Sequence, residues 1–476
     1  MNRVVLFGLF FFFIVGIFVF VAGVCSVGAL PLVEDSWSSK APMPQARSGL
    51  GVAAVDGKIY AIGGTATGLF AGEHLGVNEM YDPISDTWTT LASMPTPRMN
   101  FDIVVCEGKI YCIGGIVGRT VENVWGMKSY SFTYTNRVEV YDPVANNWSR
   151  RAPAPYSIVH TPAVVVNGQI FVLADTSLSM YDPLTDVWSA KAPMPATPQS
   201  EPYPVLFVID NKIIVTGKFE SDNPYRVDLN NFSTYDPPGP KVLVYDPEND
   251  VWGEEGVGPM VFCSGVGLVT SGVYAPQRVY FLGSSPGSTF GEVITNQAYD
   301  FSDNTWRIGT DVPNPRVDFG AVVLDDLLYV IGGTYSVGGH SASVEVFVPF
   351  GFRSVPVVGV VLPFEGAVYN ELGVELVFVV DRPFSQLYYC VDGGANVVVG
   401  GNTTLSGLSC GVHNVTVFAE DRFGNVGVSE TVTFTVASDP SNLFLSIPIL
   451  AVSGVAVVIA AGVVLAVFFR RRHVPL

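Results

Sequence analysis

A tyrosine followed by aspartate, with a tryptophan seven positions after the tyrosine, recurs five times along this chain. The pairs are Tyr81 and Trp88, Tyr141 and Trp148, Tyr181 and Trp188, Tyr245 and Trp252, and Tyr299 and Trp306. From Trp37 onward, successive tryptophans of this set lie 51, 60, 40, 64 and 54 residues apart. Repeats of this length are typical of four-stranded propeller blades with loops of variable length. The chain is therefore predicted to be a repeat protein in which these aromatic pairs fill the space between blades.

One repeat indicates how a blade forms. The segment SGLGVAAVDGKIYAIGG has two runs rich in Val, Ile and Tyr around Asp56-Gly57, a dipeptide that tolerates the positive φ angles of a tight hairpin. Gly63-Gly64 ends the second strand, and VNEMYDP supplies a third before a turn leads to Trp88 on a fourth. These registered motifs resemble the kelch repeat over residues 35 to 349. The resemblance implies an all-β propeller.

The ends of the repeat region predict six blades. The last repeat, 317–348, has three strands but no tryptophan at the expected position, and the segment around Trp37 reads as a fourth strand with no blade before it. We expect Trp37 to complete the last blade, which closes the ring and leaves no free sheet edge between its first and last blades. The predicted propeller spans residues 30–351.

A second β unit is predicted over residues 352–437, where short runs alternate apolar and polar side chains. This pattern favours a small β-sandwich of immunoglobulin or fibronectin type, and the segment resembles stalk modules of archaeal and bacterial surface proteins. We expect a disulfide between Cys390 and Cys410. Cys106 and Cys112 flank a hairpin in which they do not face each other, so we expect both to be buried and unbridged.

Two apolar runs predict the membrane topology. Residues 4–24 follow Arg3 and are read as the core of a signal peptide spanning 1–29, with an uncleaved anchor as the alternative. A polar linker, 438–442, precedes a predicted transmembrane helix over 443–469 and a basic tail over 470–476. Since positive charge favours the cytoplasmic side, a single-pass protein of the cell membrane with an extracellular propeller and sandwich is expected. Possible glycosylation sites are Asn147, Asn231, Asn402 and Asn414.

The charge of the chain narrows its partners. A net charge of −18 argues against nucleic acid as a partner, because phosphate is repelled by an acidic surface. We therefore expect an extracellular protein or glycan ligand. Because strands alternate in direction, the loops between second and third strands share one face with the links between blades. The two longest such loops, 116–137 and 218–241, carry Trp125, Tyr130 and Tyr225 among other aromatic residues, which either form a binding wall or pack the loops onto the propeller.

A second candidate site lies at the start of the first strands. The aligned positions hold Arg47, Arg98 and Arg316 on three blades that become neighbours when the ring closes, and Glu201 on another. The kelch resemblance implies that these positions line the mouth of the channel, where three arginines would bind an anion. The alternative is that each arginine braces the adjacent link through hydrogen bonds to carbonyl groups.

Enzymatic readings find less support in the sequence. A copper oxidase of the galactose oxidase kind needs two His, two Tyr and a Cys crosslinked to one Tyr. The propeller has His74, His160 and His340, which could share the loop-bearing face, but no Tyr or Cys spacing supports such a site. A sialate epimerase with kelch repeats would use Arg and Glu, which Glu201 and the arginines supply. The sequence favours a cell-surface binding or adhesion protein, with no metal, cofactor or catalytic residue assigned and a carbohydrate-active enzyme as the alternative.

Overall fold

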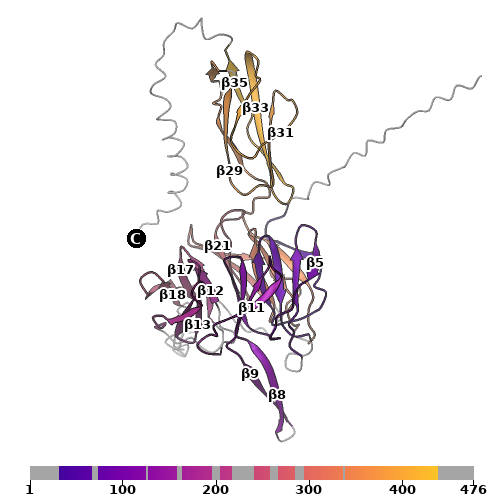
Figure 1. Cartoon of the computed structure of the whole chain (residues 1–476), viewed down its shortest axis with the longest axis vertical. Helices are drawn as coiled ribbons and strands as arrows, with labels where there is room; N and C mark the ends of the chain where they lie inside the picture. Colours follow the sequence, from indigo (N-terminus) through magenta and orange to yellow (C-terminus); the bar gives the residue numbers. More distant parts are fainter. Residues whose placement is uncertain are drawn as a thin grey trace, which may run out of the picture.

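The computed structural model describes residues 32–66, 73–124, 127–157, 163–195, 204–216, 241–257, 266–284, 294–335, 338–371 and 373–437. The described residues form two β units and no helix. Figure 1 shows the larger unit, the propeller, with the smaller unit standing on one side of it and a two-stranded ribbon projecting from the other. The predicted all-β architecture is confirmed for this part of the chain.

The propeller consists of six four-stranded antiparallel sheets. Blade 1 contains β2 (Gly51–Val55), β3 (Lys58–Ile62), β4 (Asn78–Asp82) and β5 (Thr87–Thr90). Blade 2 contains β6 (Asp102–Cys106), β7 (Lys109–Ile113), β10 (Val138–Asp142) and β11 (Asn147–Arg151). Blade 3 contains β12 (Ala163–Val166), β13 (Gln169–Ala174), β14 (Ser177–Asp182) and β15 (Val187–Ala190). Blade 4 contains β16 (Val205–Ile209), β17 (Lys212–Thr216), β18 (Lys241–Asp246) and β19 (Val251–Val257).

Blade 5 contains β20 (Val266–Val269), β21 (Arg278–Ser284), β22 (Ile294–Asp300) and β23 (Thr305–Gly309). Blade 6 contains β24 (Gly320–Leu324), β25 (Leu327–Ile331), β26 (Val344–Val348) and β1 (Ser36–Lys40). The first strands of successive blades contact each other in the cyclic order β2, β6, β12, β16, β20, β24 and back to β2. The six sheets therefore form a closed ring, as a propeller requires.

Blade 6 is completed by the N-terminal strand, as the sequence predicts. Trp37 in β1 lies opposite Phe347 in β26, with ring centroids 5.1 Å apart. The Trp37 indole donates a hydrogen bond of 2.8 Å to the carbonyl of Thr310. Strands from opposite ends of the propeller segment thus share one sheet, which removes two exposed edges.

The repeated Tyr and Trp residues pack between blades, as expected. Tyr81 is fully buried, its ring centroid lies 5.1 Å from that of Trp88, and it packs against Tyr329 of the neighbouring blade 6. Its hydroxyl donates a 2.6 Å hydrogen bond to Asp86, which also accepts a bond from the backbone N–H of Ala41. The same pair of hydrogen bonds, from the tyrosine hydroxyl and from a backbone N–H of the preceding link, recurs in blades 2, 3 and 4.

The smaller unit is a sandwich of two sheets. One sheet contains β27 (Val358–Leu362), β29 (Val374–Val380) and β32 (Thr403–Leu405). The other contains β28 (Val368–Tyr369), β35 (Val432–Val436), β33 (Gly411–Glu420), β30 (Gln386–Val391) and β31 (Val397–Val398), with β34 (Val426–Val428) paired to β33. Buried side chains of both sheets form one core that includes Leu376, Val415 and Phe434. The predicted sandwich is present, and its assignment to the immunoglobulin or fibronectin type stays a prediction.

The predicted disulfide in the sandwich is wrong. Cys390 and Cys410 are both free thiols. Cys390 lies opposite Thr416 in β33, whereas Cys410 directly precedes the first residue of that strand. Six residues of extended strand separate the two positions by about 20 Å, and a disulfide needs Cα atoms within about 7 Å. For Cys106 and Cys112 the prediction is confirmed, because both are buried free thiols that face Lys109 and Ile103.

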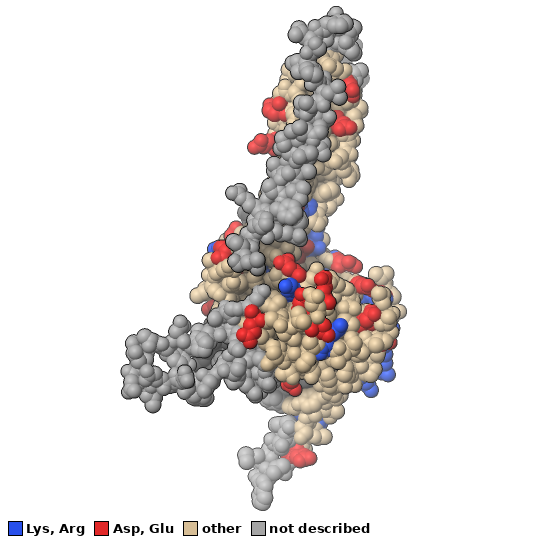
Figure 2. Space-filling model, turned by 90° about the vertical axis from the view of Figure 1, so that its left-hand side faces the viewer, with Lys and Arg blue, Asp and Glu red and all other residues tan. Residues whose placement is uncertain are grey.

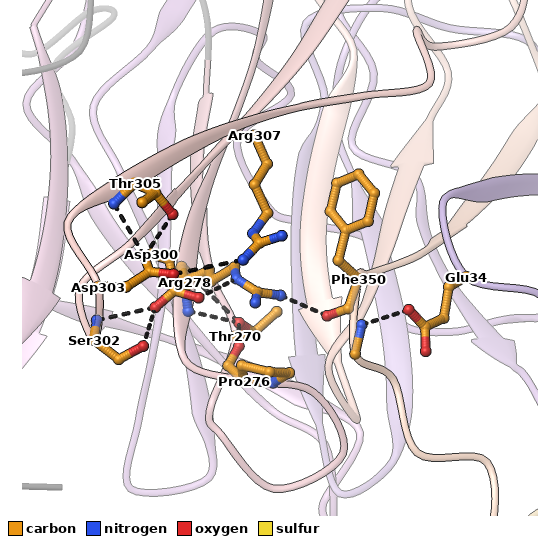
Figure 3. Close-up of polar contacts among 11 residues, drawn as sticks. Glu34, Thr270, Pro276, Arg278, Asp300, Ser302, Asp303, Thr305, Arg307 and Phe350 are labelled. Carbon is orange, nitrogen blue, oxygen red and sulfur yellow. Dashed lines mark hydrogen bonds and ion pairs between the residues drawn. The ribbon is translucent and has the colours of Figure 1, made fainter.

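Hydrogen bonds fix the segment by which the chain leaves the propeller for the sandwich. Arg278 pairs with Asp300 at 2.7 Å and donates a 2.5 Å hydrogen bond to the carbonyl of Phe350, where the chain leaves the propeller (Figure 3). The backbone N–H of Gly351 donates to Glu34 at 2.8 Å, which ties the same segment to the chain just before β1. The exit of the propeller segment is therefore fixed beside its entry.

The docking of the sandwich depends on one long turn. The first two strands of blade 5 are joined by residues 270–277, whereas blade 1 uses only Asp56-Gly57 at the same place. Tyr274 in the long turn is 5% exposed; its ring stacks on Phe352, contacts Phe423 and lies 4.8 Å from the Arg382 guanidinium. We call these four residues the Tyr274 socket. Close by, Arg422 forms an ion pair with Asp325 of blade 6.

Several predicted segments lie outside the described residues. These are the signal peptide 1–29, the linker 438–442, the transmembrane helix 443–469 and the basic tail 470–476. In the part of the chain that the structure describes, no helix is long and apolar enough to span a bilayer. The membrane topology stays a prediction.

Candidate functional site

The two faces of the propeller differ in what they carry. The turns between first and second strands lie on the face that holds the Tyr274 socket and the sandwich. The opposite face carries the connections between second and third strands and the links between blades, and we call it the loop-bearing face. From it projects the ribbon of β8 (Ile116–Val124) and β9 (Met127–Tyr134), which belongs to blade 2 (Figure 1). The loop-bearing face is therefore the face of the propeller turned away from the sandwich.

The three predicted arginines are structural braces in this structure. Arg47, Arg98 and Arg316 have no exposed surface. Each forms an ion pair with a buried glutamate on the third strand of its own blade, namely Arg47 with Glu79 at 2.6 Å, Arg98 with Glu139 at 3.1 Å, and Arg316 with Glu345. The predicted anion-binding arc at the channel mouth is corrected accordingly, because each guanidinium is neutralised and enclosed.

Carbonyl groups complete each brace. Arg98 donates to the carbonyl of Cys112 at 3.2 Å and to that of Arg137 at 3.3 Å, so it holds the second strand and the start of the third strand together. Burial lowers the pKa of Arg98, against the opposing effect of Glu139. A buried guanidinium needs such a partner because an isolated charge in the interior is strongly unfavourable. The bracing alternative considered from the sequence is the arrangement observed.

The glutamate partners of the arginines were not identified from the sequence, although the repeats contain a pattern that indicates them. Each lies two positions before the Tyr or Phe that starts the aromatic pair, in the same blades that carry the arginine. In blades 3, 4 and 5 these positions hold Ser179, Leu243 and Gln297, and the arginine positions hold Ile158, Glu201 and Cys263. Arginine and glutamate are thus present together or absent together, which a comparison of repeats within this one chain detects.

Blade 3 has a cavity near the position of the missing brace. Tyr156 donates a hydrogen bond to the carbonyl of Ser177 and shares one of 2.9 Å with the Ser179 hydroxyl, in place of a guanidinium and a carboxylate. A cavity of about 250 Å³ lies beside them, lined also by Trp188 and Lys191. Lys191 is the one charged residue among its described lining residues. The cavity is large enough for one small group of a ligand, but the residues around it do not define which.

The predicted aromatic candidates are only partly described. Trp125, Tyr225 and Glu201 lie outside the described residues, and Tyr130 belongs to β9 with no side chain described. The structure therefore does not bring them together with the arginines. In the described part of the ribbon, Val121 is 46% exposed and Tyr134 is 49% exposed. These two residues place apolar surface on the ribbon, where part of the aromatic wall was expected.

The described residues do not supply a catalytic site for either of the two enzyme classes considered from the sequence. No group of three or more His, Cys, Asp or Glu side chains that could hold a metal ion is found among them. His74 and His340 lie in the loops of the adjacent blades 1 and 6, each bridged to a threonine that follows the Gly-Gly pair, and burial lowers the pKa of both imidazoles. His160 lies outside the described residues. Both imidazoles are thus half-buried within the packing of the loops.

Comparisons with known proteins agree with the repeats. The Kelch motif model matches residues 46–95 and 315–349, which are blade 1 and most of blade 6. Beta-scruin of Limulus polyphemus is 34% identical over 150 residues, which cover 32% of this chain and 15% of that protein. Kelch-like protein 7 of Rattus norvegicus is 31% identical over 191 residues, with 30% of each chain covered. The matches show that the chain contains kelch repeats in blades 1 and 6.

Two further similarities are shorter or more distant. The influenza virus NS1A-binding protein homolog of Mus musculus is 44% identical over 79 residues, which cover 17% of this chain and 12% of that protein. The solved structure of YjhT is 14% identical, with a TM-score of 0.44, and the alignment covers 64% of this chain and 96% of that one. The chain spans less than a third of the length of the curated relatives named here.

Proposed function

We propose that this protein is a cell-surface binding or adhesion protein that presents the loop-bearing face of its kelch propeller to another protein. The observation that carries the proposal is the position of the sandwich. The sandwich contacts the face that carries the turns between first and second strands, through the Tyr274 socket. Among the described residues it does not cover the loop-bearing face, from which the ribbon projects, so that face can contact a partner. Variable loops on a rigid scaffold are the usual place for binding.

The chemistry of the site favours binding over catalysis. The arginines that an epimerase-like site would use are enclosed with glutamates, so they have no surface for a substrate in this structure. Kelch-like proteins among the relatives are named for repeats rather than for a reaction, and one relative is named for binding the protein NS1A. A protein ligand is therefore the better supported class, and an extracellular glycan is the second possibility that the experiment below also addresses.

The proposed location rests on the sequence. The apolar run 443–469, the basic residues after it and the run 4–24 are the grounds for a single-pass protein with an extracellular propeller. Three of the predicted glycosylation acceptors, Asn147, Asn402 and Asn414, are exposed on strands or turns of the two β units, and Asn231 lies outside the described residues. In this arrangement the sandwich holds the propeller away from the bilayer.

A paired-face experiment tests the proposal. A protein and glycan array is probed with residues 30–437 carrying Gln45→Arg and Pro97→Arg on exposed links of the loop-bearing face. The control carries Val144→Arg and Leu184→Arg, two residues that are 91% and 81% exposed on turns between third and fourth strands. We expect the first pair of substitutions to abolish binding of the ligands that the wild type retains, and the second pair to leave this binding unchanged. Loss with the second pair alone would place the binding site on the opposite face.

A further inference from the structure

A histidine is buried at the end of the sandwich that faces away from the propeller. Strand β33 ends at Glu420, next to the residues that contact the propeller, so its first residues lie at the opposite end of the sandwich (Figure 1). His413 near this beginning is 5% exposed, and the centroid of its ring lies 5.8 Å from that of Phe434 in β35. An imidazole at this depth needs hydrogen-bond partners for its nitrogens.

Both nitrogens of this imidazole face hydrogen-bond acceptors. Nδ1 lies 2.7 Å from a carboxylate oxygen of Asp392, and Nε2 lies 2.7 Å from the carbonyl oxygen of Ser409. A neutral imidazole carries one N–H and can donate to only one of these acceptors, whereas the imidazolium ion donates to both. The other carboxylate oxygen of Asp392 accepts a 2.8 Å hydrogen bond from the backbone N–H of Asn414. The geometry therefore corresponds to a protonated His413 beside an ionised Asp392.

The groups that contact the ring favour the same protonation state. Three elements bring them: the turn after β30 brings the Asp392 carboxylate, the loop before β33 brings the neutral Ser409 carbonyl, and β35 brings the neutral ring of Phe434. The hydrogen bond with Asp392, and after it the Ser409 carbonyl, raises the pKa of His413 against the opposing effect of burial. Burial would raise the pKa of Asp392, but the hydrogen bonds from His413 and from the Asn414 N–H lower it overall.

The charge distribution of the sandwich also favours a cation at this end. Residues 352–437 include eight acidic residues, three arginines and no lysine. The arginines, Arg353, Arg382 and Arg422, lie at the end that contacts the propeller. Figure 2 shows acidic side chains on the surface of the sandwich farther from the propeller. His413 is therefore the basic residue of the distant end, where the excess of negative charge stabilises its protonated form.

The protonated ring fixes a loop next to the point where the chain leaves the sandwich. The loop 406–410 joins β32 to β33. Within the part of the chain that the structure describes, its polar contacts are the hydrogen bond from His413 to the Ser409 carbonyl and the contact of Cys410 Sγ with the carbonyl of Ala437 at 3.8 Å. Ala437 is the last described residue. Release of Ser409 would therefore loosen the loop that contacts the exit of the sandwich.

We infer that His413 is a pH-sensitive latch, whose imidazolium joins the Asp392 turn to the Ser409 loop and whose deprotonation releases that loop. A neutral ring keeps one N–H, which the carboxylate binds more strongly than the carbonyl does, so the Ser409 oxygen loses its donor. Because folding raises the pKa of His413, the stability that the latch provides is complete below about pH 6.5 and is lost as pH rises through the higher pKa of the folded state. The inference goes beyond the proposed function, since it holds for any ligand of the propeller.

Hydrogen exchange of the full chain, followed by mass spectrometry between pH 5.5 and 9, tests the latch. After correction for the pH dependence of intrinsic exchange, the protection of residues 406–411 should fall about two- to tenfold in one step above pH 6.5. His413→Gln has donors on one atom only, so its protection should be low at every pH. Asp392→Asn keeps an acceptor for Nδ1 but removes the negative charge, so the step should move to lower pH. The control Glu430→Gln, at an exposed acidic residue of the sandwich, should leave the step in place.

A second measurement observes the proton on the wild-type chain and does not depend on the folding of any variant. In an NMR titration with labelled histidine, His413 is identified by the proximity of its ring to that of Phe434. We expect this imidazole to be protonated at pH 6.5 and to titrate above it. A ring that is neutral at pH 6.5, or wild-type protection of 406–411 that does not change with pH, would overturn the inference. A step in protection that Asp392→Asn leaves in place would assign the titration to another group and would overturn it as well.

Discussion

Replacing Arg98 with methionine distinguishes a structural role of this arginine from a role in ligand binding. The substitution removes the 3.1 Å ion pair with Glu139 and two hydrogen bonds to carbonyls, at a site where both side chains are fully buried. Glu139 keeps bonds from the backbone N–H and hydroxyl of Thr96, at 3.2 and 2.7 Å, so part of its charge remains stabilised. Breaking one partner of a buried pair costs about 3–5 kcal/mol, and we expect the lower end of this range.

The expected loss converts to a clear change in melting temperature. For a domain of about 320 residues each kcal/mol shifts the melting temperature by about 1.5 °C, so Arg98→Met should melt roughly 4–5 °C below the wild type. Tryptophan fluorescence is the appropriate measurement, because all seven tryptophans lie between Trp37 and Trp306, before the sandwich begins. The signal therefore reports unfolding of the propeller alone.

Two controls make the result decisive. Arg150 also lies near Glu139, at 3.7 Å, but its side chain is 68% exposed, so Arg150→Met should change stability by less than about 0.5 kcal/mol. The double variant Arg98→Met with Glu139→Leu removes both charges and should recover much of the loss. If Arg98→Met melted like the wild type yet lost an acidic ligand, the arginine would be a binding residue and the brace assignment would be wrong.

Two further outcomes follow from the structure. Burial raises the pKa of Asp102 to about 8, so the carboxyl is protonated in the folded state at neutral pH; the stability associated with it is present below about pH 4 and is lost as pH rises toward 8. Asp102→Asn should therefore melt above the wild type at pH 8 and near it at pH 4, and a wild-type advantage at pH 8 would contradict this. Tyr274→Ala should leave the tryptophan-monitored melting of the propeller nearly unchanged. It should increase proteolysis between the two units and broaden the distribution of distances between them in small-angle scattering. Unaltered scattering would show that the socket does not hold the sandwich.

The repeat pattern was sufficient to predict the ring because it combines local and long-range constraints. Turn residues such as Asp56 and Gly57 take positive φ angles of 47° and 74°, so the hairpins could be placed from sequence alone. The lone Trp37 predicted the closing strand because the last blade has three strands and the segment around Trp37 is a fourth strand with no blade before it. Each of these features is set by residues whose conformational or packing requirement is visible in the sequence.

The roles of the site residues were harder to predict because they depend on how deeply each side chain is buried. An arginine at the start of a strand looks the same whether its guanidinium faces the channel mouth or a buried carboxylate. Only the glutamate on the third strand distinguishes the cases, and it is 32 residues away from Arg47 and 41 from Arg98. The disulfide failed for a similar reason, since register decides whether Cys390 and Cys410 meet and the sequence pattern leaves register open. The long turn carrying Tyr274 was likewise visible only as a departure from the short hairpins.

The braces are distributed in a way that relates the fold to the proposed function. They occupy blades 6, 1 and 2. The ring is closed within blade 6, where β1 and β26 are joined by hydrogen bonds and not by a continuous chain, so the braces lie in this blade and in the two that follow it. The brace of blade 2 also lies directly before Met99, the residue that pairs with the base of the ribbon. A rigid base matters for a projecting arm, because a small rotation at Ile116 is multiplied along the nine residues of β8. Arg98→Met should therefore weaken protection of the ribbon amides from hydrogen exchange even below the melting transition, whereas Arg316→Met, on the other side of the closure, should destabilise the ring and leave the ribbon protected. Equal effects of the two variants on the ribbon would show that its order does not depend on the brace beneath it.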